Sequence, residues 1–229
     1  MSSALYLSLR QRAAACASAM LLSAAIVPGA LSAGALCVLA SSASAQTPPD
    51  RFVESISNDV LNRIRSDKSV QSGDFQQVSK FVDSAVMPHV NFERMTALSV
   101  GRAWRQASAD QQKALVAEYR TLLLRTYSGA LSQVGDKQVK VRPFRGDAGA
   151  DEVIVRSEIL GGRGDPIQID YRLEKSGAAW KIYDVNVLGI WIVQTYRDQF
   201  AQEVSARGID GLIRSLSDKN RQFEAAPRG

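Results

Sequence analysis

Apolar residues recur every three or four positions along the stretch that follows residue 46, and this spacing predicts amphipathic helices. Asp50 can cap a first helix that reaches Ile64. A second helix is expected between Phe75 and Val82, and Asn91 can cap a third.

The longest helix of this half begins at a capping box. Ser108 is followed three residues later by Gln111, a spacing at which each side chain can bond the backbone N–H of the other residue. Apolar residues then continue at helical spacing as far as Leu131. The stretch up to Leu131 is therefore expected to be helical.

The period of the pattern then changes from 3.6 to 2, the side-chain period of a β-strand. Four such runs follow, at residues 137–145, 152–160, 167–174 and 179–188. Short glycine-rich turns join them, so consecutive runs must pair antiparallel. Two closing helices are expected at residues 190–206 and 210–220. The predicted fold class is α+β, with helices packed on one face of a curved four-stranded antiparallel sheet.

The fourth run changes parity along its length. Trp180 and Ile182 share one face, whereas Val185 and Val187 take the opposite one. The change requires either a β-bulge near Tyr183 or cover on both faces of the strand, and we favour the bulge.

Residues 1–45 have the pattern of a secretory signal. The stretch has no acidic residue, carries two arginines near its start, and ends its small and apolar run in an A-x-A pattern at 43–45. A membrane anchor is the alternative, but Pro28 interrupts the run and its weight is Ala and Ser. We expect cleavage before Gln46, which leaves residues 46–229 as a single α+β domain.

Composition excludes several kinds of chemistry. Both cysteines, Cys16 and Cys37, lie in the predicted signal, so the mature chain would form no disulfide. His89 is the single histidine, so no His cluster is available for a metal. The 28 Lys+Arg stand against 23 Asp+Glu, a mild excess that does not indicate nucleic-acid binding.

No catalytic motif emerges from the residues that could take part in one. His89 lies in a loop without a partner in sequence, and Asp184 lies among apolar strand residues at the suspected bulge. Asp184 can act as a general base, or it can pair with an arginine or cap a backbone turn, and we favour the second. The glycines at 161–164 join strand to strand, unlike a phosphate loop, which opens a helix.

Basic residues fall along the first strand run, at Lys137, Lys140, Arg142 and Arg145. They either protect a solvated edge strand from aggregation or contact anionic headgroups or an acidic protein. Aromatic residues are not interleaved with them, so a groove for single-stranded nucleic acid is not expected.

Large apolar residues gather between Trp180 and Phe200. They either form ordinary core or, because a concave sheet under helices can enclose space, line an apolar cavity for an apolar ligand.

Three segments together resemble one family: Asn91–Leu131, Trp180–Phe200 and Gly208–Asn220. In order and spacing they are similar to the MlaC family, the periplasmic phospholipid-binding component of the Mla system, also called the toluene-tolerance auxiliary family. The resemblance covers essentially the whole mature chain. Hopanoid-associated relatives share the pattern, so it identifies the family better than the ligand.

The resemblance implies a soluble periplasmic carrier and not an enzyme. Such a carrier takes a glycerophospholipid from an outer-membrane lipoprotein and porin complex and passes it to an inner-membrane ABC transporter through a ring-forming lipid-binding subunit. It needs no cofactor, because the lipid is cargo, and it has no permanent membrane anchor.

Thirteen apolar residues are the candidates for lipid contact, and ordinary core packing remains open for each of them because the same alternation produces both. They are Met95, Leu98, Trp104, Leu122, Tyr127, Ile167, Ile169, Tyr171, Trp180, Ile182, Val185, Val187 and Ile190.

Three alternatives remain at this stage. The chain could carry another lipid such as a hopanoid, it could be a small hydrolase or isomerase on an α+β cone with Asp184 or His89 as base, or it could be a protein-binding module without a ligand.

Overall fold

The computed structural model describes residues 47–131, 137–147, 149–161 and 165–225. These residues all belong to one compact unit, Ala43–Gly229. The predicted signal at residues 1–45 lies outside the described part, so it stays a prediction. In the part that is described, no helix has the length and apolar character needed to span a membrane.

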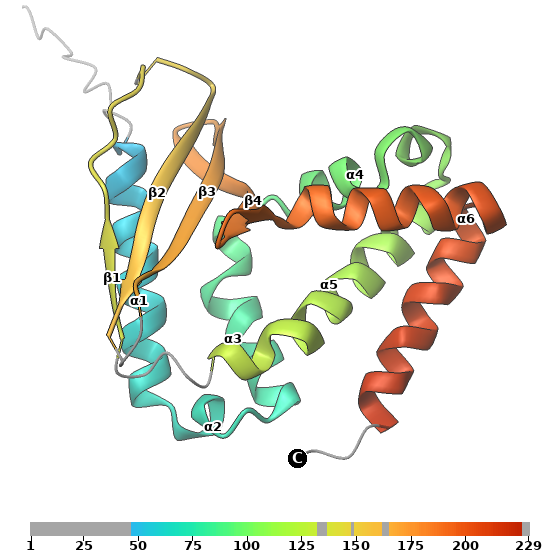
Figure 1. The fold of residues 1–229 in the computed structure, drawn as a ribbon, viewed down its shortest axis with the longest axis horizontal. Coiled ribbons are helices and arrows are strands. Elements are labelled where there is room, and N and C mark those ends of the chain that lie inside the picture. Colours follow the sequence, from blue (N-terminus) through green and yellow to red (C-terminus); the bar gives the residue numbers. More distant parts are fainter. Residues whose placement is uncertain (1–46, 132–136, 148, 162–164, 226–229) are drawn as a thin grey trace, which may run out of the picture. The chain divides into compact units, whose positions relative to one another are not determined.

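Helices make up most of the chain before the sheet. They are α1 (Pro49–Ser66), α2 (Lys68–Gln71), α3 (Phe75–Ala85), α4 (Phe92–Val100) and α5 (Ala109–Leu131), with 3₁₀ turns η1 (Met87–His89) and η2 (Gly101–Gln106). The last helix, α6 (Ile192–Ala225), follows the sheet and bends at Gly208, where φ is 68°. In Figure 1, α6 leaves the end of the sheet and runs along α4 and α5, which it contacts.

Two of the predicted helix starts are confirmed. The Asn91 side chain accepts a hydrogen bond from the Arg94 backbone N–H at 3.0 Å. Ser108 and Gln111 form the reciprocal bonds of a capping box, at 2.9 and 3.2 Å.

The predicted cap at Asp50 is wrong, because α1 already begins at Pro49 and Asp50 lies in its first turn. One carboxylate oxygen of Asp50 instead accepts a hydrogen bond from the Phe144 backbone N–H at 3.1 Å. The residue therefore ties the first helix to the segment after the first strand.

The sheet has five antiparallel strands in sequence order, not the predicted four. They are β1 (Gln138–Val141), β2 (Glu152–Leu160), β3 (Ile167–Ser176), β4 (Ala179–Val187) and β5 (Ile190–Trp191). The α+β class is confirmed. The first strand is shorter than predicted, because the pairing in β1 ends at Val141.

The extra strand arises from a tight turn that the periodicity did not reveal. Leu188 and Gly189 have φ values of 53° and 89°. Two successive positive φ values reverse the chain within two residues, as in a β-hairpin. Ile190 therefore pairs with Val187 instead of starting the last helix, which begins at Ile192.

The predicted β-bulge is confirmed. Arg172 of β3 lies opposite Asp184, but the next residue, Leu173, lies opposite Ile182, so Tyr183 has no partner in the register. Because of this extra residue, Ile182 and Val185 share one face of the sheet and the Asp184 side chain turns to the other.

The described interior divides into three separate apolar clusters. One joins α4, α5 and α6 around Leu115 and Tyr119, the second joins Val53 of α1 to the sheet, and the third joins α1, α2 and α3 around Val78. Figure 1 shows the corresponding arrangement, with α1 behind β1 and β2, and α5 and α6 beyond β4. Val90 packs against both the first and the second cluster.

Candidate functional site

One face of the sheet is apolar, and α1 covers only part of it. The covered part contains Val155, Leu173 and Trp180, which pack with Val53 of the helix. Residues opposite one another in the register extend the same face along β2, β3 and β4 as far as Ile167.

The path of α1 is diagonal. At its start, the Trp180 indole N–H of β4 donates to the Thr47 carbonyl at 2.9 Å. At its end, the Arg65 guanidinium donates to the Lys137 carbonyl beside β1 at 2.7 Å. A helix that crosses from β4 to β1 in this way leaves the start of β3 and the end of β4 without cover.

The uncovered part is formed by Ile159, Ile167, Ile169 and Val187, which we call the open end of the apolar face. Ile167 pairs with Ile159, and Ile169 pairs with Val187. All four side chains are partly exposed, and none belongs to the three apolar clusters. Neighbouring aliphatic residues that remain partly exposed to solvent in the folded protein form a surface suited to an apolar ligand.

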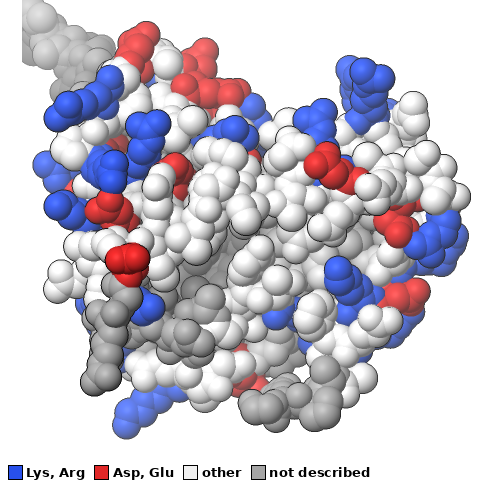
Figure 2. All heavy atoms as spheres, viewed as in Figure 1, with Lys and Arg blue, Asp and Glu red and all other residues white. Residues whose placement is uncertain are grey.

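Figure 2 shows a hollow in the middle of the face it presents, with uncharged side chains around it and most Lys, Arg, Asp and Glu at the periphery. Enclosure of this hollow into the predicted cavity stays a prediction.

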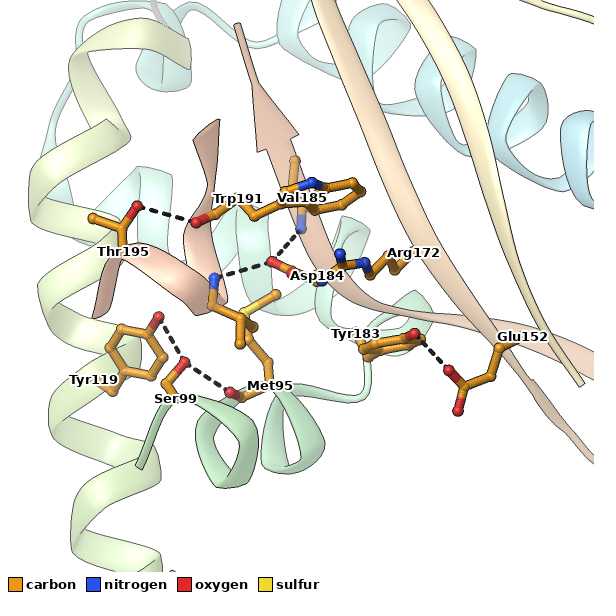
Figure 3. Close-up of polar contacts among 11 residues, drawn as sticks. Met95, Ser99, Tyr119, Glu152, Arg172, Tyr183, Asp184, Val185, Trp191 and Thr195 are labelled. Atoms are coloured by element: carbon orange, nitrogen blue, oxygen red, sulfur yellow. Dashed lines mark hydrogen bonds and ion pairs between the residues drawn. The ribbon is translucent and has the colours of Figure 1, made fainter. Parts of the chain in front are cut away.

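A buried carboxylate joins the sheet to α6. Asp184 has no exposed surface, and one of its oxygens accepts hydrogen bonds from the backbone N–H groups of Val193 and Val185 at 3.0 and 2.9 Å. The other oxygen pairs with the Arg172 guanidinium at 2.9 Å, and that guanidinium lies 3.9 Å from the centroid of the Trp191 ring. Figure 3 shows these groups converging where β4 and β5 meet the start of α6.

These contacts decide between the two roles considered for Asp184. Burial raises the pKa of its carboxyl, while the N–H donors and Arg172 oppose the shift. Both oxygens already accept bonds that hold the fold together, so the interpretation as an arginine-paired cap is confirmed.

A second polar group ties α4 to the sheet. The Arg94 guanidinium pairs with Glu152 of β2 and Glu174 of β3, and lies 3.9 Å from the centroid of the Tyr183 ring. The Tyr183 hydroxyl donates to Glu152 at 2.7 Å, as Figure 3 shows. The hydrogen bond from Arg94 lowers the pKa of Glu152, and burial raises the pKa of Tyr183 to about 12.

His89 is half-buried and its ring meets the Phe52 ring edge-on at 5.9 Å. Burial lowers the pKa of His89. The contact is that of a packed side chain. Within the described ranges, no group of three His, Cys, Asp or Glu residues could hold a metal ion.

The structure distributes the thirteen predicted contact residues over several places. Met95 and Leu122 are buried among α4, α5 and α6, with Leu98 and Trp104 packed against that cluster. Trp180 and Ile182 are buried under α1, with Tyr171 and Val185 beside them.

The remaining five are more accessible. Ile167, Ile169 and Val187 lie at the open end, while Tyr127 of α5 and Ile190 of β5 are exposed by 42% and 63%. Sequence reasoning missed Ile159, although its parity with Val153 and Val155 in the second strand run placed it on the same face. The assignment to lipid contact remains a prediction for all of them.

Comparison with known proteins identifies the family. The profile described as "MlaC protein" matches residues 54–218. The chain belongs to the MlaC family. Its resemblance to that family, seen first in three sequence segments, is thereby confirmed.

Relatives of this MlaC chain are known from several bacteria. It is 25% identical to the toluene tolerance protein ttg2D of Pseudomonas putida over 168 residues, 73% of this chain and 77% of that protein. It is 20% identical to the intermembrane phospholipid transport system binding protein MlaC of Haemophilus influenzae over 183 residues, 79% of this chain and 86% of that protein.

A solved structure resembles this MlaC chain more strongly. The phospholipid-binding protein of Ralstonia solanacearum, in complex with a phospholipid, is 38% identical and superposes with a TM-score of 0.75. The match covers 78% of this chain and 99% of that one.

Proposed function

We propose that this chain is a periplasmic phospholipid carrier that holds acyl chains against the open end of its apolar face. The observation that carries the proposal is the set of four partly exposed aliphatic residues, Ile159, Ile167, Ile169 and Val187, which lie outside the three apolar clusters of the described residues. The phospholipid bound by the Ralstonia solanacearum protein of the same fold supports it.

The physical need for a carrier follows from the cost of wetting the acyl chains. Two chains with roughly 30 CH₂ groups in total would cost about 25 kcal/mol to expose to water. A protein that keeps the chains dry and leaves the headgroup wet removes most of this barrier. Such a site needs shape and apolar surface, and it does not need a catalytic motif.

The family supplies the finer part of the proposal. We infer that the signal at residues 1–45 directs export, and that the mature chain moves phospholipid between an outer-membrane lipoprotein and porin complex and an inner-membrane ABC transporter with a lipid-binding ring subunit. The name of the Haemophilus influenzae relative, an intermembrane phospholipid transport binding protein, supports this role.

Native mass spectrometry of the freshly purified protein tests lipid binding. We expect a phospholipid adduct in the wild type, and at least about a tenfold lower bound fraction in Ile169→Asp or Val187→Asp, because a carboxylate there must lose water when acyl chains approach. Phe223→Asp is the control, because Phe223 is an exposed apolar residue near the end of α6 and outside the sheet.

Undiminished lipid in both open-end variants would refute the proposed position of the acyl chains. An adduct with the mass of a hopanoid would show that the cargo is a hopanoid and not a phospholipid. A wild-type protein that never co-purifies with lipid and takes none up from vesicles would refute the carrier function itself.

A further inference from the structure

The opposite face of the sheet carries a pocket of its own. It has a volume of about 740 Å³ and lies between β1, β2 and the segment from Arg142 to Gly146 that follows β1. The strand pairing places Lys140 opposite Glu158, with side chains on the face away from Val153 and Val155. The pocket is therefore separated from the open end of the apolar face by the sheet itself.

Four cations and one carboxylate line this pocket: Lys140, Arg142, Arg145, Arg156 and Glu158. Glu158 is already paired with Arg142. Among the described residues, no carboxylate lies within ion-pair distance of Lys140, Arg145 or Arg156. Basic side chains thus outnumber acidic ones in the lining of the pocket, although Glu158 lies opposite Lys140 and Asp170 lies opposite Arg156 in the strand register.

The wall of the pocket is held in place by main-chain contacts. The Arg142 backbone N–H donates to the Arg156 carbonyl at 2.8 Å, and the Phe144 N–H donates to the Asp50 carboxylate at 3.1 Å. Gly146 lies against the Phe144 ring so closely that a Cβ there would approach Cζ to 2.4 Å. The basic side chains therefore project from a fixed rim.

An apolar side chain accompanies the charges. Ile154 lines the pocket and is 43% exposed, which is unusual for an isoleucine inside a strand. Figure 2 shows several Lys and Arg side chains, with Asp and Glu among them, on the side where Figure 1 draws β1 and β2. Basic side chains next to an exposed aliphatic residue are the combination found on surfaces that rest on anionic bilayers.

We propose that this basic pocket, with Lys140, Arg145, Arg156 and Ile154, docks the protein on bilayers that contain anionic phospholipids. Charge complementarity selects the partner, because four basic side chains line the pocket against one carboxylate, and Lys140, Arg145 and Arg156 form no ion pair with any described residue. The surface binds the bilayer weakly and reversibly, since a few cations and one aliphatic side chain provide only modest attraction. The proposal does not depend on the carrier function.

Vesicle flotation of the purified protein tests this docking. We compare vesicles of phosphatidylcholine alone with vesicles that also contain phosphatidylglycerol. Binding should require phosphatidylglycerol and should fall as salt is raised, because salt screens the attraction. Arg145→Glu with Arg156→Glu should lower the bound fraction at least about tenfold.

The control carries the same change of charge elsewhere. Arg102→Glu with Arg105→Glu alters two exposed arginines of η2 in the helical part of the chain and should leave binding close to that of the wild type. If the Glu variant of the pocket fails to fold, as judged by its melting curve, Arg145→Gln with Arg156→Gln provides the same test with a smaller loss.

Three results would overturn the docking proposal. They are wild-type protein that ignores phosphatidylglycerol, pocket variants that bind as well as the wild type, and control variants that lose as much as the pocket variants. Native mass spectrometry of the same samples separates this outcome from failure of the carrier function. Pocket variants should keep their lipid, whereas Ile169→Asp should lose lipid and still bind vesicles.

Discussion

Removal of the Asp184 carboxylate should detach the start of α6 from the sheet. In Asp184→Ala, the backbone N–H groups of Val193 and Val185 lose their acceptor and the Arg172 guanidinium loses its counter-ion. Asp184 has no exposed surface, so water cannot simply take its place. A buried N–H left without an acceptor costs about 1–3 kcal/mol, whereas Arg172 is 36% exposed and can be solvated, so we expect a loss of about 2–5 kcal/mol from the two N–H groups.

The free energy of unfolding, measured by urea denaturation, checks the expectation. Asp184→Asn keeps an oxygen that can accept from Val193 but loses the charge, so its loss should be about 1–3 kcal/mol. Asp198→Ala is the control, because Asp198 is exposed on α6 and accepts a hydrogen bond from the Gln194 side chain one turn earlier in the same helix. The free energy of unfolding of Asp198→Ala should differ from that of the wild type by no more than about 0.5 kcal/mol.

A loss in Asp184→Ala no larger than that in Asp198→Ala would refute the reasoning. It would mean that the start of α6 is held by apolar packing alone and that the hydrogen bonds to Asp184 are replaced at little cost. An unchanged midpoint with a smaller denaturant dependence would instead indicate a change in compactness, which a second probe of the transition resolves.

Two further changes test other parts of the structure. Arg94→Ala should raise the pKa of Glu152, measured by NMR titration, because the guanidinium lowers that pKa. A carboxylate whose pKa is lowered in the folded state stabilises the fold above its unfolded pKa, and this stabilisation is lost as pH falls through the folded pKa, so the variant should lose less stability on acidification than the wild type. An unchanged pKa of Glu152 in the variant would contradict the pairing. Leu188→Asn should raise the free energy of unfolding by about 0.5–1 kcal/mol, because Asn tolerates positive φ better than Leu and the Leu188 side chain is 65% exposed. A lower free energy of unfolding in this variant would mean that the Leu188 side chain makes stabilising contacts despite its exposure.

Local chemistry was sufficient to predict much of the fold. The capping box at Ser108 and Gln111 depends on two side chains and the backbone between them, and it forms even though the Gln111 amide also donates to the distant Asp210. The bulge at Tyr183 was visible because apolar residues change parity within one strand. The MlaC family was recognised because its long segments keep their order and spacing.

The fifth strand could not be predicted in the same way. Turns with two positive φ values favour Asn or Gly, and the first position here is Leu188, which carries no such signal. The pairing of Ile190 with Val187 compensates for that conformation, and a pairing partner is not visible in the periodicity of either residue.

The sequence by itself determined which residues are apolar, which of them belong to the first four strands and which face of each strand they share. Only the tertiary structure decided which of them remain partly exposed. Trp180 and Ile169 follow the same alternation, yet one lies under α1 and the other lies beyond it. The path of α1 makes the difference, and contacts between residues 133 and 72 positions apart set that path. Periodicity reports the local side-chain direction, whereas cover depends on where a distant helix is anchored.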